Sequence, residues 1–269
     1  PNSTTRVFAV ASGKGGVGKS SMTVNLATAL AARGLNVGIL DADIYGHSIP
    51  HMLGSDARPH QVDDMIMPPI AHGVKIISIG HFVEGNTPVI WRGPMLHRAI
   101  QQFLSEVFWS DLDILLLDLP PGTGDIALSV AQLVPSAELL IVTTPQAAAA
   151  EVAERAGAMS QQTRQKVAGV IENMSAMVMP DGSVVDVFGS GGGQMVADRL
   201  STLTGTKIEL LGSVPLDPAL RIGADDGNPI AITAPDSHTG AALNAIADKL
   251  AMRRESLAGR PLGLGVVPH

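Results

Sequence analysis

The fold of this 269-residue chain is decided by the stretch Val7-Phe8-Ala9-Val10-Ala11-Ser12-Gly13-Lys14-Gly15-Gly16-Val17-Gly18-Lys19-Ser20-Ser21. Its first half is short and apolar, which is typical of a buried parallel strand. Its second half fits the pattern G-x-x-x-x-G-K-[ST], in which glycines free the backbone to wrap an anion. Residues 22–33 then place apolar side chains at helical spacing. Strand, glycine-rich loop and helix are the context that this motif requires, so the sequence predicts a phosphate-binding loop.

The predicted loop assigns roles to its own residues. Backbone amides and the start of the following helix favour negative charge, so phosphates are expected there. We expect Lys19 to reach the β- and γ-phosphates and the Ser20 hydroxyl to bind Mg²⁺. The alternative is a glycine-rich turn that matches by chance, and the flanking strand and helix argue against it. The residues predicted to contact a nucleotide here are Gly13, Lys14, Gly15, Gly16, Val17, Gly18, Lys19, Ser20 and Ser21.

Composition excludes several function classes. The net charge is −7 without a run of lysine or arginine, which argues against nonspecific nucleic-acid binding. No apolar run approaches the roughly 18 residues of a membrane span, and no signal peptide is present, so we expect a cytoplasmic protein without membrane attachment. The cysteine count is zero, which excludes disulfides and thiolate metal sites within this chain.

Domain organisation follows from length and composition. No linker-like change in composition interrupts the chain, so we expect one α/β domain over residues 1–256. The Gly/Pro-rich residues 257–269 are expected to form a flexible tail. The chain begins at Pro1, so residues upstream are expected to be missing.

Two further predicted strands end in carboxylates, at the sheet edge where open α/β sheets bind ligands. Residues 36–40 lead into Asp41 and Asp43. Asp43 is predicted to orient the water that attacks the γ-phosphate, and Asp41 to lie near the Mg²⁺ shell. The alternative is an acidic pair that caps the next turn. The strand predicted within residues 112–119 ends in Asp118, which is predicted to hold Mg²⁺ mostly through water. Gly122 in the following loop is predicted to sense the γ-phosphate.

The second half of the chain carries weaker signals. Asn173 follows a predicted strand over residues 167–171 and is placed to contact an adenine edge, although an ordinary turn asparagine is the alternative. A last strand over residues 208–214 is followed by Pro215 and Asp217, whose backbone groups are expected to contact the adenine ring. The run 189–193 lacks a lysine and a preceding strand, so a flexible turn or the start of a helix is preferred to a second phosphate loop.

With these segments in place, the chain resembles the Mrp/ApbC-type deviant Walker P-loop ATPases, which are bacterial iron–sulfur cluster carrier proteins. The resemblance extends from Arg6 to about Pro229. Trp-Arg-Gly-Pro, Glu-Asn-Met-Ser and Phe-Gly-x-Gly-Gly-Gly distinguish it from the related MinD and ParA proteins. The motifs that carry the resemblance are residues 13–20, 41–46, 89–95, 115–125, 142–146, 172–175, 188–193 and 214–217.

The resemblance implies a mostly parallel central sheet flanked by helices on both faces, and slow ATP hydrolysis that depends on Mg²⁺. It implies a homodimer in which Lys14 reaches the partner's nucleotide; the alternative for Lys14 is a solvated loop lysine. It also implies transfer of iron–sulfur clusters to apoproteins or assembly factors. The catalytic residues would be Lys14, Lys19 and Asp43, and the Mg²⁺ residues would be Ser20, Asp41 and Asp118. Two alternatives stay open for Arg92: a role in nucleotide or dimer chemistry, and a surface ion pair.

The chain departs from the family at the cluster ligands. Family members that carry a cluster have a C-P-x-C element after the Asn-Met-Ser motif, and here Met179 and Gly182 stand at the two cysteine positions. A thioether does not replace an anionic thiolate, and glycine offers no ligand. A cluster would be ligated by an upstream segment or a partner, or this branch kept the ATPase and lost the cargo site.

Two other functions remain open from the sequence. A MinD/ParA-like nucleotide-dependent binding switch without cluster cargo needs a lipid-binding helix or a basic DNA-binding face, and the sequence shows neither. An insertion factor for another metal or cofactor is the third hypothesis.

Overall fold

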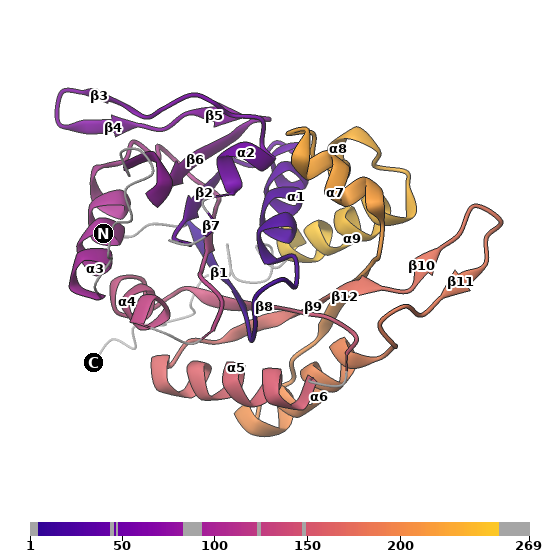
Figure 1. Cartoon of the computed structure of the whole chain (residues 1–269). Helices are drawn as coiled ribbons and strands as arrows, with labels where there is room; N and C mark the ends of the chain where they lie inside the picture. The colour runs from indigo at the N-terminus through magenta and orange to yellow at the C-terminus, as the bar shows by residue number, and fades with distance from the viewer. Residues whose placement is uncertain are drawn as a thin grey trace, which may run out of the picture.

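The computed structural model describes residues 5–43, 46, 48–82, 93–122, 125–146 and 149–252. At its centre lies an eight-stranded sheet (Figure 1). Its strands are β1 (Arg6–Ser12), β2 (Val37–Asp41), β5 (Ile70–Ala71), β6 (Val74–Ser78), β7 (Ile114–Asp118), β8 (Glu138–Thr143), β9 (Val167–Ser175) and β12 (Leu210–Pro215). Their order is β12-β9-β8-β1-β7-β2-β6-β5, and each neighbouring pair is parallel except the antiparallel edge pair β5–β6.

Strand β1 lies in the middle of the sheet, between β7 and β8. The parallel register pairs Val10 with Asp118 and Ser12 with Val142. On β2, Asp41 pairs with Asp118. The loop after β1 and the acidic ends of β2 and β7 therefore meet at one edge of the sheet, where open α/β sheets bind their ligands.

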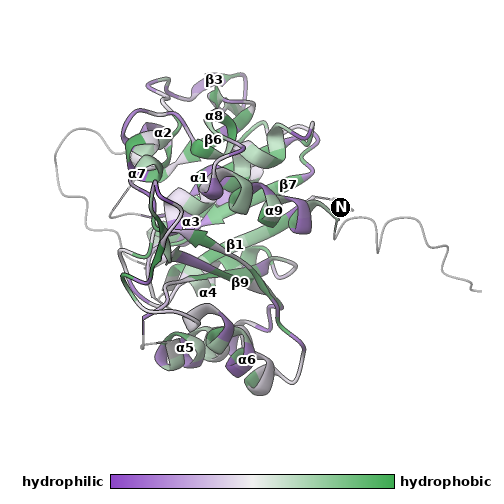
Figure 2. Ribbon diagram, turned by 90° about the vertical axis from the view of Figure 1, so that its right-hand side faces the viewer, coloured by the Kyte–Doolittle hydropathy of each residue, from purple (hydrophilic) through white to green (hydrophobic). Residues whose placement is uncertain are grey.

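Helices cover both faces of the sheet. Figure 2 shows α5 and α6 on one side of the apolar strands and α1 and α9 on the other. The helices are α1 (Lys19–Ala31), α2 (Ile49–Met52), α3 (Gly93–Glu106), α4 (Asp125–Leu133), α5 (Ala149–Thr163), α6 (Gly192–Thr204), α7 (Pro218–Asp225), α8 (Ile230–Thr233) and α9 (His238–Met252), with a 3₁₀ helix at Ile79–Phe82. The predicted fold class, a mostly parallel sheet flanked by helices on both faces, is confirmed.

The core consists of two apolar layers, one on each face of the sheet. Along β1, Phe8 and Val10 pack in the layer of α1, α8 and α9. Ala9 and Ala11 belong to the layer of α3, α4, α5 and α6. A strand that is covered on both faces needs apolar side chains at every position, which is why the runs 7–11 and 114–117 lack alternation. These runs were sufficient to predict the central strands.

Other elements differ from the sequence-based expectation. Strand β9 continues to Ser175, so Asn173 is a strand residue and the turn alternative is wrong. The alternation over residues 74–79 predicts a hairpin or an edge-strand excursion. Instead, β6 is a mostly buried parallel strand beside β2, and only the short β5 forms the antiparallel edge. Two small hairpins, β3 (His60–Val62) with β4 (Met65–Met67) and β10 (Met177–Val178) with β11 (Val184–Val185), project from the body (Figure 1).

The glycine run 189–193 forms the start of a helix, which was one of the two preferred readings. Gly191 is the N-cap of α6 with a φ of 79°. A Cβ on Gly192 would lie 2.7 Å from the Pro145 carbonyl oxygen, and one on Gly193 would lie 2.6 Å from Glu172 Cβ. The run therefore allows α6 to approach β8 and β9 closely, and Glu172 Oε2 accepts a hydrogen bond from Gly193 N at 2.6 Å.

Several expectations concern residues outside the described ranges. Arg92, the residues before Thr5 and the predicted tail 257–269 are among them. The expectation of one domain over residues 1–256 stays a prediction. Among the described residues, no helix is long and apolar enough to span a membrane.

Candidate functional site

The conformation of the loop between β1 and α1 depends on two of its glycines. Gly16 and Gly18 have φ angles of 78° and 81°, in the left-handed region that favours glycine. Gly18 is also the N-cap of α1, and Met22 N donates to its carbonyl oxygen at 3.0 Å. A Cβ on Gly18 would lie 2.2 Å from Asn173 Nδ2. Both the backbone angle and the packing therefore require glycine here.

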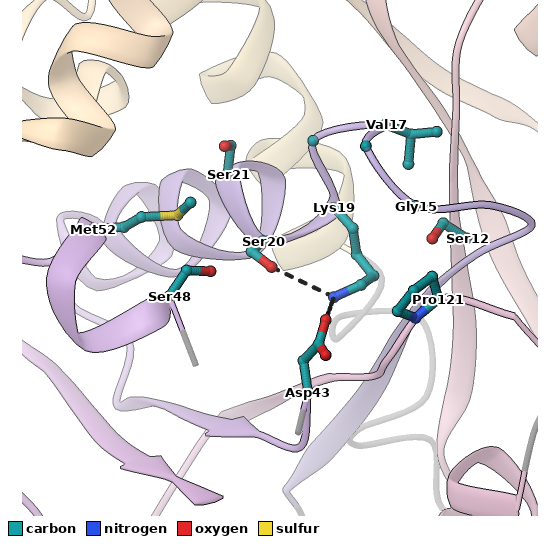
Figure 3. Close-up of a pocket in the computed structure, with 12 residues that line it drawn as sticks. Ser12, Gly15, Val17, Lys19, Ser20, Ser21, Asp43, Ser48, Met52 and Pro121 are labelled. Carbon is teal, nitrogen blue, oxygen red and sulfur yellow. Dashed lines mark hydrogen bonds and ion pairs between the residues drawn. The ribbon is translucent and has the colours of Figure 1, made fainter. Parts of the chain in front are cut away.

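A cavity of about 230 Å³ lies over this loop (Figure 3). Its walls come from the loop and α1, from the segment after β2, from α2 and from the loop after β7. In Figure 3 the side chains of Lys19 and Asp43 point toward one another. The lining residues are Ser12, Gly15, Gly16, Val17, Gly18, Lys19, Ser20, Ser21, Asp43, Ser48, Met52 and Pro121.

The centre of the site is a buried cluster of opposite charges. Lys19 Nζ lies 2.7 Å from Asp118 Oδ2 and 3.8 Å from Asp43 Oδ2. The Ser20 hydroxyl donates to Asp118 Oδ2 at 2.7 Å. Lys19 is only 6% exposed and Asp118 is fully buried, so each charge depends on the other for compensation. The structure thus brings together four of the predicted residues from three parts of the chain.

Asp41 lies behind this cluster and does not line the cavity. Its carboxylate accepts hydrogen bonds from Ser78 Oγ at 2.9 Å and from Asp43 N at 3.1 Å. Burial and the nearby charge of Asp118 raise the pKa of Asp41 to about 7, although the hydrogen bonds from Ser78 and Asp43 and the charge of Lys19 oppose the change. A carboxyl with this pKa is partly protonated at neutral pH.

Gly13 and Lys14 lie beside the cavity and do not line it. The exposed Lys14 Nζ donates to Gln146 Oε1 at 2.7 Å. The Gly13 carbonyl oxygen accepts a hydrogen bond from Arg155 on α5 at 2.9 Å. Gly122 N donates to the Ser12 carbonyl oxygen at 3.1 Å, so the loop after β7 rests on the end of β1.

The predicted adenine residues lie in two places. Asn173 is buried against the phosphate loop, where Nδ2 donates to the Val17 carbonyl oxygen at 2.9 Å. Its Oδ1 has no hydrogen-bond partner among the described residues. Pro215 and Asp217 line a second hollow, of about 340 Å³, together with Met177 and Met179.

The Asp217 carboxylate is occupied by helix capping. It accepts hydrogen bonds from Ala219 N at 2.8 Å and from Thr239 Oγ1 at 2.7 Å, and it is the N-cap of α7. Any contact of this segment with a nucleotide would come from backbone groups, as the sequence reading expected.

Sequence reasoning missed two hydroxyl residues that bind the acidic cluster. Thr23 donates to Asp118 Oδ1 at 2.7 Å, and Ser78 donates to Asp41. The signal for Thr23 was its position four residues after Lys19, which places both on one face of α1. Ser78 ends β6 and pairs in register with Asp41, which becomes evident only once β6 is known to lie beside β2.

The residues present fit a magnesium ion. The Ser20 hydroxyl lines the cavity, and the Asp118 carboxylate lies directly behind it, 2.7 Å from the Ser20 oxygen. Mg²⁺ is usually held by one or two such oxygen donors together with water and phosphate oxygens. Within the described part of the chain, no group of three or more His, Asp or Glu side chains could hold a metal ion.

Comparisons with known proteins agree with this geometry. Residues 3–251 match the family model described as ParA, NUBPL iron-transfer P-loop NTPase. The chain is 68% identical to the iron-sulfur cluster carrier protein of Mycobacterium leprae over 264 residues, covering 98% of this chain and 69% of that protein. It is 46% identical to the iron-sulfur cluster carrier protein of Escherichia coli over 253 residues, covering 93% and 67%.

Solved structures support the same fold. A nucleotide-binding protein from Archaeoglobus fulgidus in complex with ADP superposes with a TM-score of 0.70 at 37% identity, covering 82% of this chain and 86% of that chain. MinD from Aquifex aeolicus superposes with a TM-score of 0.64 at 21% identity, covering 92% and 97%. The second likeness shows the fold alone.

Asp41 makes the stability of the nucleotide-free protein depend on pH. Its pKa is about 7 in the folded chain and 3.8 in a model peptide, so ionisation costs the folded state more than the unfolded state. The free energy of unfolding should therefore fall as pH rises from about 4 to about 7, by at most about 4 kcal/mol. Asp41→Asn should remove most of this fall, as measured by urea denaturation across that pH range.

Two features make this test specific. Burial lowers the pKa of His81, but its contribution is the same in both proteins and cancels in the comparison. The matched control is Asp198→Asn on the exposed side of α6, which should retain the slope of the wild-type protein. Equal slopes for Asp41→Asn and the wild-type protein would show that Asp41 does not titrate as stated.

Proposed function

Because the chain belongs to the ParA family of NUBPL iron-transfer P-loop NTPases, we propose that it binds ATP with Mg²⁺, hydrolyses it slowly and thereby drives transfer of iron–sulfur clusters to apoproteins. The observation that carries the proposal is a cluster of contacting side chains beside the cavity over the glycine-rich loop. Its members are Lys19, Ser20, Asp43 and Asp118. The proposed reaction takes place in the cytoplasm, where ATP is available.

The proposed chemistry is phosphoryl transfer to water. The loop amides and Lys19 bind the phosphates, and the ammonium group exchanges its contact with Asp118 for the β- and γ-phosphate oxygens. Magnesium, when bound, neutralises charge on the phosphates, and Ser20 and Asp118 would hold it. Catalysis of this kind rests on positioning and electrostatic stabilisation, for which the buried cluster is suited.

Asp43 is the residue proposed to orient the attacking water. Its carboxylate lines the cavity on the opposite side of Lys19 from the phosphate loop, with Oδ2 3.8 Å from Nζ. A carboxylate at this position can accept a hydrogen bond from a water beside the terminal phosphate. Asp41 is proposed to act from behind, by its hydrogen bond from Asp43 N and its charge near the magnesium shell.

The proposed active form is a homodimer in which Lys14 serves the partner's nucleotide. Support comes from the side chain of Lys14, which is exposed, lies outside the cavity of its own chain and, among the described residues, donates a hydrogen bond to the neutral amide of Gln146. A hydrogen bond to an exposed neutral group is weak and can be exchanged for a phosphate contact. Gly122, which rests on Ser12, is proposed to respond to the γ-phosphate.

Asn173 is proposed to select adenine. Its amide nitrogen donates a hydrogen bond to the Val17 carbonyl oxygen, while its buried Oδ1 has no hydrogen-bond partner within the described residues. An unpaired buried acceptor is costly, and the 6-amino group of adenine is a donor that would satisfy it. Backbone groups near Pro215 and Asp217 are proposed to contact the rest of the ring.

The residues of this chain do not fit an iron–sulfur cluster. None of the 269 residues is cysteine, and the hairpin β10–β11 carries Met179 and Gly182 where thiolates would be needed. Relatives named iron-sulfur cluster carrier proteins reach 68% identity. We therefore assign the nucleotide-driven step to this chain and the cluster ligands to an apoprotein, an assembly factor or residues outside this sequence. A MinD-like switch without cargo is not favoured, since the likeness to MinD is 21% identity.

Lys19→Ala should abolish ATP hydrolysis, lowering kcat by at least about 100-fold, because the loop loses the cation that stabilises the transferred phosphoryl group. Phosphate release in the presence of Mg²⁺ measures it. Lys249→Ala, which removes a lysine bonded to the Leu211 carbonyl oxygen outside the cavity, should retain activity. Normal hydrolysis by the Lys19 variant would refute the proposed mechanism.

Asn173→Ala should reduce the preference for ATP over ITP, which replaces the 6-amino donor with an acceptor. We expect the Kd for ITP divided by the Kd for ATP to fall by about 10-fold, which corresponds to the loss of one hydrogen bond to a buried acceptor. Loss of the contact with Val17 weakens both nucleotides equally and leaves the ratio unchanged. An unchanged ratio in calorimetric titrations would remove Asn173 from adenine recognition.

Anaerobic reconstitution with iron and sulfide should leave no stable cluster on this chain alone, because it offers no thiolate. Iron and sulfide assays after gel filtration measure this, and the Escherichia coli relative treated in parallel is the positive control. A stoichiometric cluster that survives chromatography would show that other groups of this chain ligate it.

A further inference from the structure

We propose that Thr23 is a positioning residue of the magnesium site, which holds the Asp118 carboxylate so that Oδ2 faces Ser20 and the cavity. This role rests on the proposed binding of ATP with Mg²⁺. It adds a residue that neither the phosphate-loop motif nor the strand ending in Asp118 identifies.

The two oxygens of Asp118 have separate partners. Oδ2 accepts hydrogen bonds from Lys19 Nζ and Ser20 Oγ, both at 2.7 Å, on the side of the cavity. Oδ1 accepts a hydrogen bond from Thr23 Oγ1 at 2.7 Å, on the side of α1. Both Thr23 and Asp118 are fully buried, so water does not replace this contact. The plane of the carboxylate is therefore set from both sides.

The Thr23 hydroxyl has one proton and two acceptors within reach. Its oxygen lies 3.1 Å from the Lys19 carbonyl oxygen and 2.7 Å from Asp118 Oδ1. The shorter, charge-assisted bond to the carboxylate is the stronger one. Thr28, five residues further along α1 and equally buried, lies 3.1 Å from the carbonyl oxygens of Val24 and Asn25 within its own helix. A helical threonine usually donates its hydroxyl proton to a carbonyl oxygen of its own helix, as Thr28 does. Thr23 also reaches a carboxylate at the end of a strand.

The contact from Thr23 matters most when a nucleotide is present. With nucleotide bound, Lys19 and Ser20 would contact phosphate oxygens and the metal, and Oδ2 would lose the two hydrogen bonds that it accepts from them. Thr23 is the remaining hydroxyl that holds the carboxylate plane. Its effect is that of an outer-shell partner, which orients a metal-binding carboxylate without touching the metal. Asp41, next to Asp118 across the β2–β7 pair, is held in the same manner by Ser78.

The experiment compares three variants by the affinity of a fluorescent ADP analogue as a function of Mg²⁺ concentration. Thr23→Val should raise the half-saturating Mg²⁺ concentration by about 10- to 100-fold, the usual effect of removing an outer-shell partner. Its nucleotide affinity in EDTA should equal that of the wild-type protein. Thr23→Ser, which retains the hydroxyl, should restore the Mg²⁺ response. Thr28→Val, the matched control on the same helix, should leave it unchanged.

Each outcome decides between the two proposals. If the Thr23→Val and Thr28→Val variants both show the half-saturating Mg²⁺ concentration of the wild-type protein, the role of Thr23 is overturned and the proposed function stands. A wild-type protein whose nucleotide affinity does not respond to Mg²⁺ overturns the magnesium site itself. Circular dichroism establishes folding first. Should the valine variant not fold, Thr23→Cys, which replaces the hydroxyl with a much weaker thiol donor, is expected to show the same displaced Mg²⁺ response, and a wild-type response would overturn the role.

Discussion

The ion pair between Lys19 and Asp118 is the contact on which the site depends. Lys19 begins α1, and Asp118 ends β7, the neighbour of β1 in the sheet. Two buried charges are stable only when geometry and further hydrogen bonds compensate their loss of hydration, and Ser20 and Thr23 supply those bonds. The same contact ties the first turn of α1 to the sheet edge. The glycine-rich loop before α1 is therefore held in shape by the residues that are proposed to act on the nucleotide.

Much of this arrangement was predictable because its signals are local. A phosphate loop needs glycine at fixed spacing, and the positive φ of Gly18 and its contact with Asn173 explain that need in this chain. Central strands need apolar residues on both faces, so residues 7–11 and 114–117 identified β1 and β7. The motifs assigned Lys19 to the phosphates and Asp118 to Mg²⁺, and the parallel pairing of β1 with β7 brings the two side chains together.

The parts that escaped prediction depend on contacts between distant segments. Ser78 reaches Asp41 only because β6 lies in register with β2, and a mixed pattern over residues 74–79 did not reveal that pairing. Strand β9 extends past Ile171 because β12 pairs with it up to Ser175, which no local propensity of Glu-Asn-Met-Ser indicates. In each case tertiary packing, not intrinsic preference, decided the local structure.

The absence of cysteine has a practical consequence for work on the projecting hairpin. A single thiol introduced at Val184, which is 63% exposed on β11, would be the only thiol in the molecule. Maleimide chemistry would then attach one spectroscopic probe to the arm that projects from the body, with no background labelling elsewhere in the chain. A relative with a C-P-x-C element offers thiols of its own to the reagent. This chain is thus a naturally thiol-free background in which motion of the arm during a nucleotide cycle can be followed directly.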